Sequence, residues 1–196
     1  MSLLSPRPTG RSAHVVGGPG RLADRTFHFL AVVVAVQGTH VFEHIVQLGQ
    51  VYIWDVPEDD ALGLLGYVFE FNGTEEWLHL TYNALYLAAL YALVGPLWRI
   101  TPATLPSYAF IAFVASTIVE TWHLVEHVVI ISHVIANQGC PCPGIGDAAL
   151  GISDVVLHFV YNVVAYAGVV LAFFIILRRR RPGRRHTPDS AHDRAA

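Results

Sequence analysis

Two short histidine–glutamate motifs lie inside apolar stretches of the sequence. The pattern His-x-x-Glu-His occurs at His40–His44 and again at His123–His127. Residues three and four apart share one face of a helix, so each motif would present two imidazoles and a carboxylate together. Such groups are costly in apolar surroundings unless a partner neutralises them. We expect that partner to be a metal ion.

A second pair of motifs has the order acid, leucine, histidine, tyrosine, asparagine. The first copy is Glu75, Leu78, His79, Tyr82 and Asn83, and the second is Asp154, Leu157, His158, Tyr161 and Asn162. Thr74 and Ser153 precede the two acids and fit helix caps. Two matches in the same order, together with the repeated His-x-x-Glu-His, predict a duplicated helical hairpin.

The repeated residues form one candidate metal centre. The expected ligands are His40, His44, His79, His123, His127, His158, Glu43, Glu126, Glu75 and Asp154. Glu43 and Glu126 are also the expected catalytic residues. Asn83, Asn162, Glu120, Tyr82 and Tyr161 are expected around the ligands, where they would orient the histidines. Glu75 and Asp154 are equally explained as acids that stabilise a helix N-terminus.

Two divalent transition-metal ions fit this set of residues. Four carboxylates among neutral imidazoles carry a charge of −4, which two divalent ions cancel. Facing helices that carry histidines and carboxylates often hold dinuclear sites. Iron or copper is favoured and zinc also fits. A bis-histidine haem is less favoured because of the excess carboxylates. The alternative without metal is a hydrogen-bonded histidine–glutamate network.

The two copies differ at two polar positions. Glu120 aligns with Gln37, and His133 aligns with Gln50. We expect Glu120 to make the two metal sites chemically unequal. His133 is equally explained as a wet residue near the membrane surface.

The composition predicts an integral membrane protein. The chain is 54% hydrophobic but only 14% charged, whereas soluble domains average about 25% charged residues. Four apolar segments are long enough to span a bilayer as helices, at 27–52, 75–98, 107–136 and 154–177. We therefore expect an all-α bundle of four transmembrane helices, built from two tandem hairpin repeats. Both repeats keep one orientation, so their pseudo-twofold axis would follow the membrane normal.

The arginines predict the orientation. All twelve basic residues are arginines, and they lie before the first segment, between the second and third, or after the fourth. Both termini would then be in the cytoplasm, with the metal centre in the outer half of the cell membrane. The expected parts are a disordered tail at 1–26, a first hairpin at 27–98 with an outer loop at 53–74, a second hairpin at 99–177, and a basic tail at 178–196.

Two other features of the sequence each have more than one interpretation. The outer loop carries an apolar stretch, Ala61 to Phe71, that fits a short helix on the membrane surface or over the bundle. Cys140 and Cys142 stand in a Cys-Pro-Cys-Pro sequence in the second outer loop and fit a reactive thiol pair, a metal contact or a plain loop. The net charge of −3 gives no reason to expect a nucleic-acid partner.

Three classes of function fit the motifs. The spacing His-x-x-x-His resembles the first histidine box of membrane desaturases and hydroxylases, although the His-x-x-His-His boxes of that group are missing. The favoured function is therefore an oxidoreductase that acts on a lipid or another apolar small molecule, with a redox partner. His-x-x-Glu-His is also the inverted zincin motif of zinc hydrolases. The third class is a metal-binding or metal-transport protein without catalysis.

Overall fold

The computed structural model describes residues 19–68, 76–137 and 143–180, and this part of the chain folds into helices without strands. Four are long: α1 (Pro19–Trp54), α3 (Glu76–Ile100), α4 (Ser107–Ala136) and α6 (Asp154–Arg180). Three are short: a 3₁₀ turn at Glu58–Asp60, α2 (Gly63–Val68) and α5 (Ile145–Leu150). Glu75, Cys140 and Cys142 lie outside the described residues.

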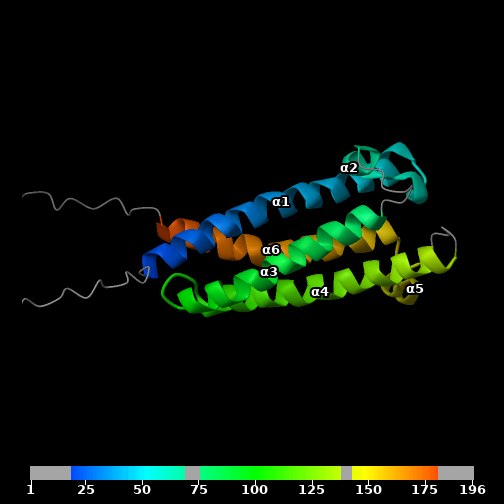
Figure 1. Ribbon diagram of the computed structural model, residues 1–196. Helices are drawn as coiled ribbons and strands as arrows, with labels where there is room; N and C mark the ends of the chain where they lie inside the picture. The colour runs from blue at the N-terminus through cyan, green and yellow to red at the C-terminus, as the bar shows by residue number, and fades with distance from the viewer. Residues whose placement is uncertain (1–18, 69–75, 138–142, 181–196) are drawn as a thin grey trace, which may run out of the picture.

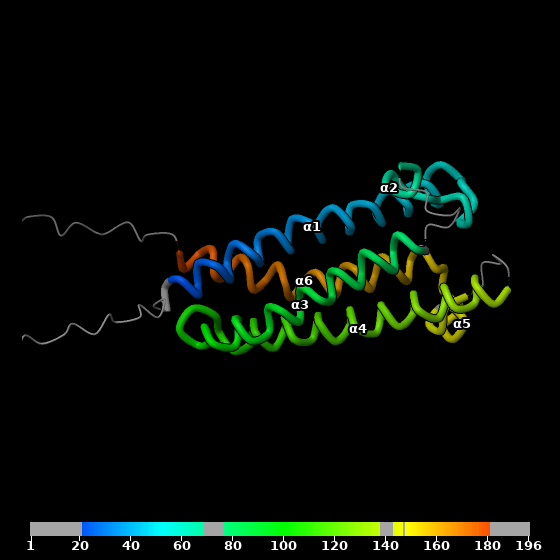
Figure 2. Tube along the Cα trace, in the orientation of Figure 1, coloured from blue at the N-terminus to red at the C-terminus, as the bar shows by residue number. Residues whose placement is uncertain are grey.

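The long helices form a four-membered ring. α1 packs against α3 and α6, and α4 packs against the same two helices. Figure 1 shows α2 and α5 at one end of the bundle, while the α3–α4 turn lies at the other end together with the start of α1 and the end of α6. The trace in Figure 2 shows that each short helix folds back beside the long helix that precedes it.

All four long helices are long and apolar enough to cross a membrane, as the sequence predicts. Their burial pattern differs from that of a water-soluble bundle. Large apolar side chains such as Val32, Ile111 and Ile118 point outward, whereas His40, Glu120 and other polar side chains are buried. Apolar outer faces suit lipid, and the buried polar groups require partners inside the bundle.

Two helices are longer than expected from the sequence. α1 begins at Pro19, inside the predicted disordered tail, and α6 ends at Arg180, inside the predicted basic tail. No helix-breaking residue separates Arg21 from Phe27, and proline is well suited to a first helical turn. Arginine is a good helix former, and Arg180 pairs with Asp24 of α1 at 2.5 Å. The predicted start of the first helix and the predicted end of the last helix, which were based on polarity, were therefore too close to the apolar segments.

The interior divides into two halves along the bundle. The half next to the α3–α4 turn is filled by apolar side chains such as Leu30, Leu93, Phe113 and Ile176. The half next to α2 and α5 holds the buried histidines. Gly168 lets α6 approach α4 closely, since a Cβ there would collide with the Ala112 carbonyl oxygen and the Ser116 hydroxyl. The apolar half thus holds the helices at a fixed spacing beneath the polar half.

Candidate metal centre

Two pairs of histidines one helical turn apart begin the site. In α1 the Nε2 atoms of His40 and His44 lie 3.3 Å apart. In α4 the Nε2 atoms of His123 and His127 lie 3.1 Å apart. Two nitrogens bound tetrahedrally to one ion at about 2.0–2.1 Å are roughly 3.3 Å apart. Both separations suit a shared metal ion, and they equally suit an N–H···N hydrogen bond between the two rings.

A third histidine from α6 completes the first of two clusters. The His158 ring centroid lies 4.6 Å from that of His127 and 5.2 Å from that of His123. These three buried residues offer ligand atoms that all lie within 4.8 Å of one another. We call them the α4/α6 triad. Among the described residues this is the one group of three or more histidine, cysteine or acidic side chains gathered so closely.

The corresponding residues of α1 and α3 form a looser cluster. The His79 ring centroid lies 5.6 Å from that of His40 and 5.3 Å from that of His44. We call these three residues the α1/α3 triad. All three are buried, but their ligand atoms do not come within the 4.8 Å that encloses the α4/α6 triad. The six predicted histidines thus lie in one polar interior, as two unequal groups.

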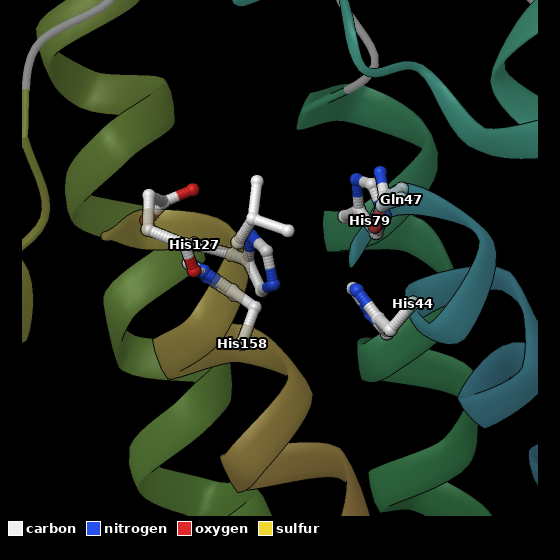
Figure 3. Close-up of a pocket in the computed structure, with 7 residues that line it drawn as sticks. His44, Gln47, His79, His127 and His158 are labelled. Carbon is white, nitrogen blue, oxygen red and sulfur yellow. Dashed lines mark hydrogen bonds and ion pairs between the residues drawn. The ribbon is translucent and has the colours of Figure 1, made fainter. Parts of the chain in front are cut away.

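The two triads face each other across the middle of the bundle. His79 and His127 lie with parallel rings, at 4° between planes and 5.6 Å between centroids. Figure 3 shows His44, Gln47 and His79 on one side of a narrow space, with His127 and His158 on the other. This space is a cavity of about 20 Å³. Both triads therefore border one common space.

Glu43 and Glu126 are buried beside the triads, where their carboxylates bind the short helices. The Leu65 amide of α2 donates to Glu43 Oε1 at 2.5 Å, and the Ile145 amide of α5 donates to Glu126 Oε2 at 2.6 Å. A helix N-terminus favours a negative charge in this way. The structure brings both glutamates next to the histidines and gives each an anchoring contact that the sequence did not predict.

Glycines make these carboxylate contacts sterically possible. A Cβ on Gly63 would overlap the Glu43 carboxylate, and a Cβ on Gly146 would lie 2.9 Å from Glu126 Oε1. Gly63 also has φ +69°, which other residues rarely adopt. Gly146 follows Gly63 at the same spacing as Glu126 follows Glu43, so the repeat contained this signal. The sequence analysis did not use this signal. It also did not predict the role of Gln50, whose Oε1 accepts a hydrogen bond from the Gly63 amide at 2.8 Å.

Asp154 is placed to orient His158. Its Oδ1 lies 3.0 Å from His158 Nδ1. The carboxylate contacts Nδ1 and so orients the ring, an arrangement in which Nε2 would be the nitrogen that serves as a metal ligand. Asp154 is also in the first turn of α6, so the predicted helix-terminal role and an orienting role coincide. The equivalent acid, Glu75, lies outside the described residues.

Glu120 and Gln37 occupy aligned positions but have different partners. Glu120 is fully buried and its Oε2 lies 3.4 Å from His123 Nδ1. Gln37 instead donates from Nε2 to Asn162 Oδ1 at 2.8 Å. Asn83, the counterpart of Asn162, is fully buried, and neither of its side-chain polar atoms has a partner among the described residues. The polar surroundings of the two triads are therefore unequal.

The two predicted tyrosines lie against histidines. The Tyr82 ring stacks on His40 with centroids 4.1 Å apart, and its hydroxyl donates to the Val36 carbonyl. The Tyr161 ring lies 5.3 Å from His123, and its hydroxyl accepts a hydrogen bond from Trp122 Nε1 at 3.0 Å. Both tyrosines thus limit the rotation of a histidine ring. His133, by contrast, lies near α5 at the wall of a separate pocket and away from the triads.

No protein-family model, no curated protein and no solved structure matches the chain. The chemistry of the site therefore rests on the residues themselves. A buried histidine cluster that could hold a metal ion, inside a bundle of four helices long and apolar enough to cross a membrane, is what the structure shows.

Proposed function

We propose that this chain is an integral membrane metalloprotein that holds one transition-metal ion in each histidine triad. The observation that carries the proposal is the α4/α6 triad, whose three ligand atoms lie within 4.8 Å of one another in a buried site. Imidazole is a common ligand of transition-metal ions, and three buried imidazoles this close could serve together as ligands of one ion.

The second ion is proposed because the helix pair α1/α3 has the same features as the helix pair α4/α6. The first helix of each pair carries two Nε2 atoms one turn apart, at 3.3 Å in α1 and 3.1 Å in α4. Each also has a histidine on its second long helix and a glutamate bound to a short helix. A duplicated hairpin with a pseudo-twofold axis along the membrane normal accounts for these matches.

The proposed class is oxidoreductase, with iron or copper as the metal. All-imidazole donor sets suit both metals. In this proposal the histidines bind the ions, while Asp154 and Glu120 orient two of the rings through Nδ1. A bound iron or copper ion would supply the electron-transfer step, and an external redox partner would supply the electrons. The arginine distribution supports cytoplasmic termini in the cell membrane.

A zinc hydrolase is the less supported alternative. That mechanism uses the glutamate of His-x-x-Glu-His as the base that activates a metal-bound water. Here Glu126 Oε2 accepts the Ile145 amide at 2.6 Å, and Glu43 Oε1 accepts the Leu65 amide at 2.5 Å. We therefore assign both glutamates a positioning role, in which they hold α2 and α5 against the helices that carry the histidines.

Elemental analysis of detergent-purified protein tests the proposal. Wild type is expected to carry two redox-active metal ions per chain, and His40→Ala and His123→Ala each to carry one fewer. His28→Ala is the matched control, because His28 lies on the exposed surface of α1 and bonds the Asp24 carbonyl. Zinc in a colourless protein would overturn the redox assignment. Metal content unaffected by both triad substitutions would overturn the metal centre itself.

A further inference from the structure

The space between the two triads has walls from both of them. His44 and His79 form one wall, and His127 and His158 form the other (Figure 3). Asp154 and Val155, from the first turn of α6, also border the space. A molecule in this position contacts the α1/α3 triad and the α4/α6 triad at the same time.

The size of the space limits what it can hold. Its volume is about 20 Å³, whereas one water molecule requires about 10–15 Å³ on this measure. The space therefore holds about one or two water-sized atoms, so it suits only molecules of a few atoms. A lipid chain or an aromatic ring does not fit between the triads without moving the histidines, which are held by helix packing and by ring contacts with their neighbours.

A small molecule has a route to this space. Asp154 borders the cavity, yet its side chain is 41% exposed. The aspartate therefore lies where the cavity opens, at the end of the bundle that carries α2 and α5. Access from this end does not require passage through the apolar half of the interior.

We propose that this space binds a molecule of two or three atoms with a donor at each end, the class that contains dioxygen and azide, and that this molecule bridges the two metal ions. The inference rests on the proposed metal centre, because the ions supply the two attachment points. Residues of both triads line the space, so one small molecule there could reach an ion held by either triad. This inference restricts the substrate of the proposed metal centre to a molecule of two or three atoms.

Azide titration of protein loaded with cobalt(II) tests the inference, since the visible bands of cobalt(II) change when its coordination changes. Wild type is expected to give a saturable spectral change with azide and none with pyridine, which is too large. Val155→Phe fills the space and is expected to weaken azide binding at least ~10-fold, with cobalt content unchanged. Val163→Phe is the matched control, because Val163 lies on the outer surface of the same helix.

A second measurement tests the bridging position. The double variant His40→Ala with His44→Ala is expected to keep cobalt in the α4/α6 triad but to bind azide at least ~10-fold more weakly, because one attachment point is lost.

The outcomes separate the two proposals. Wild type that takes up no cobalt contradicts the metal centre itself. Cobalt uptake without a spectral response to azide, equal responses to azide and pyridine, or a double variant with unchanged azide affinity each overturns the bridging site while leaving the metal centre in place. If Val155→Phe does not fold, the pyridine comparison in wild type still decides the size limit.

Discussion

The two histidine triads use the same residue types at the same helical spacing, but only one of them is tightly gathered. The α4/α6 triad brings its ligand atoms within 4.8 Å of one another. Its rings also have acidic neighbours, Glu120 beside His123 and Asp154 beside His158. In the α1/α3 triad the position of Glu120 is taken by Gln37, which bonds Asn162 instead. The residues that surround the imidazoles, more than the imidazoles themselves, distinguish the two sites.

The helices that carry the two triads also differ at a position that affects packing. Gly168 brings α6 close to α4, whereas the aligned position in α3 is Ala89. We expect the close approach of α6 to α4 at Gly168 to help bring His158 near the α4 pair. If each triad binds an ion as proposed, we predict that the α4/α6 triad binds it more tightly and that the α1/α3 triad exchanges it more readily.

The largest expected effect comes from removing the third histidine of each triad. His158→Ala is expected to weaken binding of the tighter ion by more than ~100-fold, above the 10–100-fold range for residues that only support a ligand. His79→Ala is expected to release the weaker ion first and to leave the tighter one bound. Competition titration with a chelator of known affinity measures both. Equal losses from both variants would show that the triads do not act as separate sites.

The next effect concerns the buried carboxylate beside His123. Glu120→Gln removes a negative charge 3.4 Å from His123 Nδ1 and is expected to weaken the tighter ion by about 10–100-fold. The reciprocal change Gln37→Glu is expected to strengthen the weaker ion, so that the two affinities approach each other. The same chelator titration measures both shifts, and Glu120→Asp is expected to restore part of the affinity. An unchanged affinity in Glu120→Gln would assign Glu120 a purely structural role.

Substitutions at the aligned positions Gly168 of α6 and Ala89 of α3 are expected to lower the stability of the protein by different amounts. Gly168→Ala places a Cβ against the Ala112 carbonyl oxygen and the Ser116 hydroxyl, and overpacking of this kind costs about 1–3 kcal/mol. Ala89→Gly is expected to cost about 0.5–1 kcal/mol, the usual penalty for glycine within a helix. Unfolding of the metal-free protein in detergent, followed by circular dichroism, measures both. A Gly168→Ala protein as stable as wild type would contradict the close approach of α4 and α6.

The smallest effect is expected at the glutamates that bind the short helices. Glu43→Gln and Glu126→Gln each replace a charge-assisted hydrogen bond by a neutral one, at a cost of about 1 kcal/mol. Metal content is expected to stay at the wild-type level in both variants. Proteolysis near α2 and α5 reports the loosened helices. Loss of a metal ion in either variant would show that the glutamate is itself a ligand.

Periodicity and repetition were enough to predict the long helices and the meeting of the six histidines. Apolar segments of membrane length are a strong signal, and the spacing of His40 and His44 fixes their common face. The anchoring of Glu43 and Glu126 could not be predicted in the same way, because it depends on how distant loops fold back. α5 was missed for a related reason, since six residues without an apolar pattern carry no helical signal of their own. The repeated spacing of Gly63 and Gly146 was the clue available in the sequence.

X-ray absorption spectroscopy at the edge of the bound metal would identify the atoms that ligate each ion. We expect about three imidazole nitrogens at about 2.0–2.1 Å from each ion. It also predicts that His158→Ala lowers the average number of nitrogens while His28→Ala leaves it unchanged. A sulfur shell at about 2.3 Å, which only cysteine ligands would produce, or a spectrum without imidazole scattering would contradict a metal centre built from the two histidine triads.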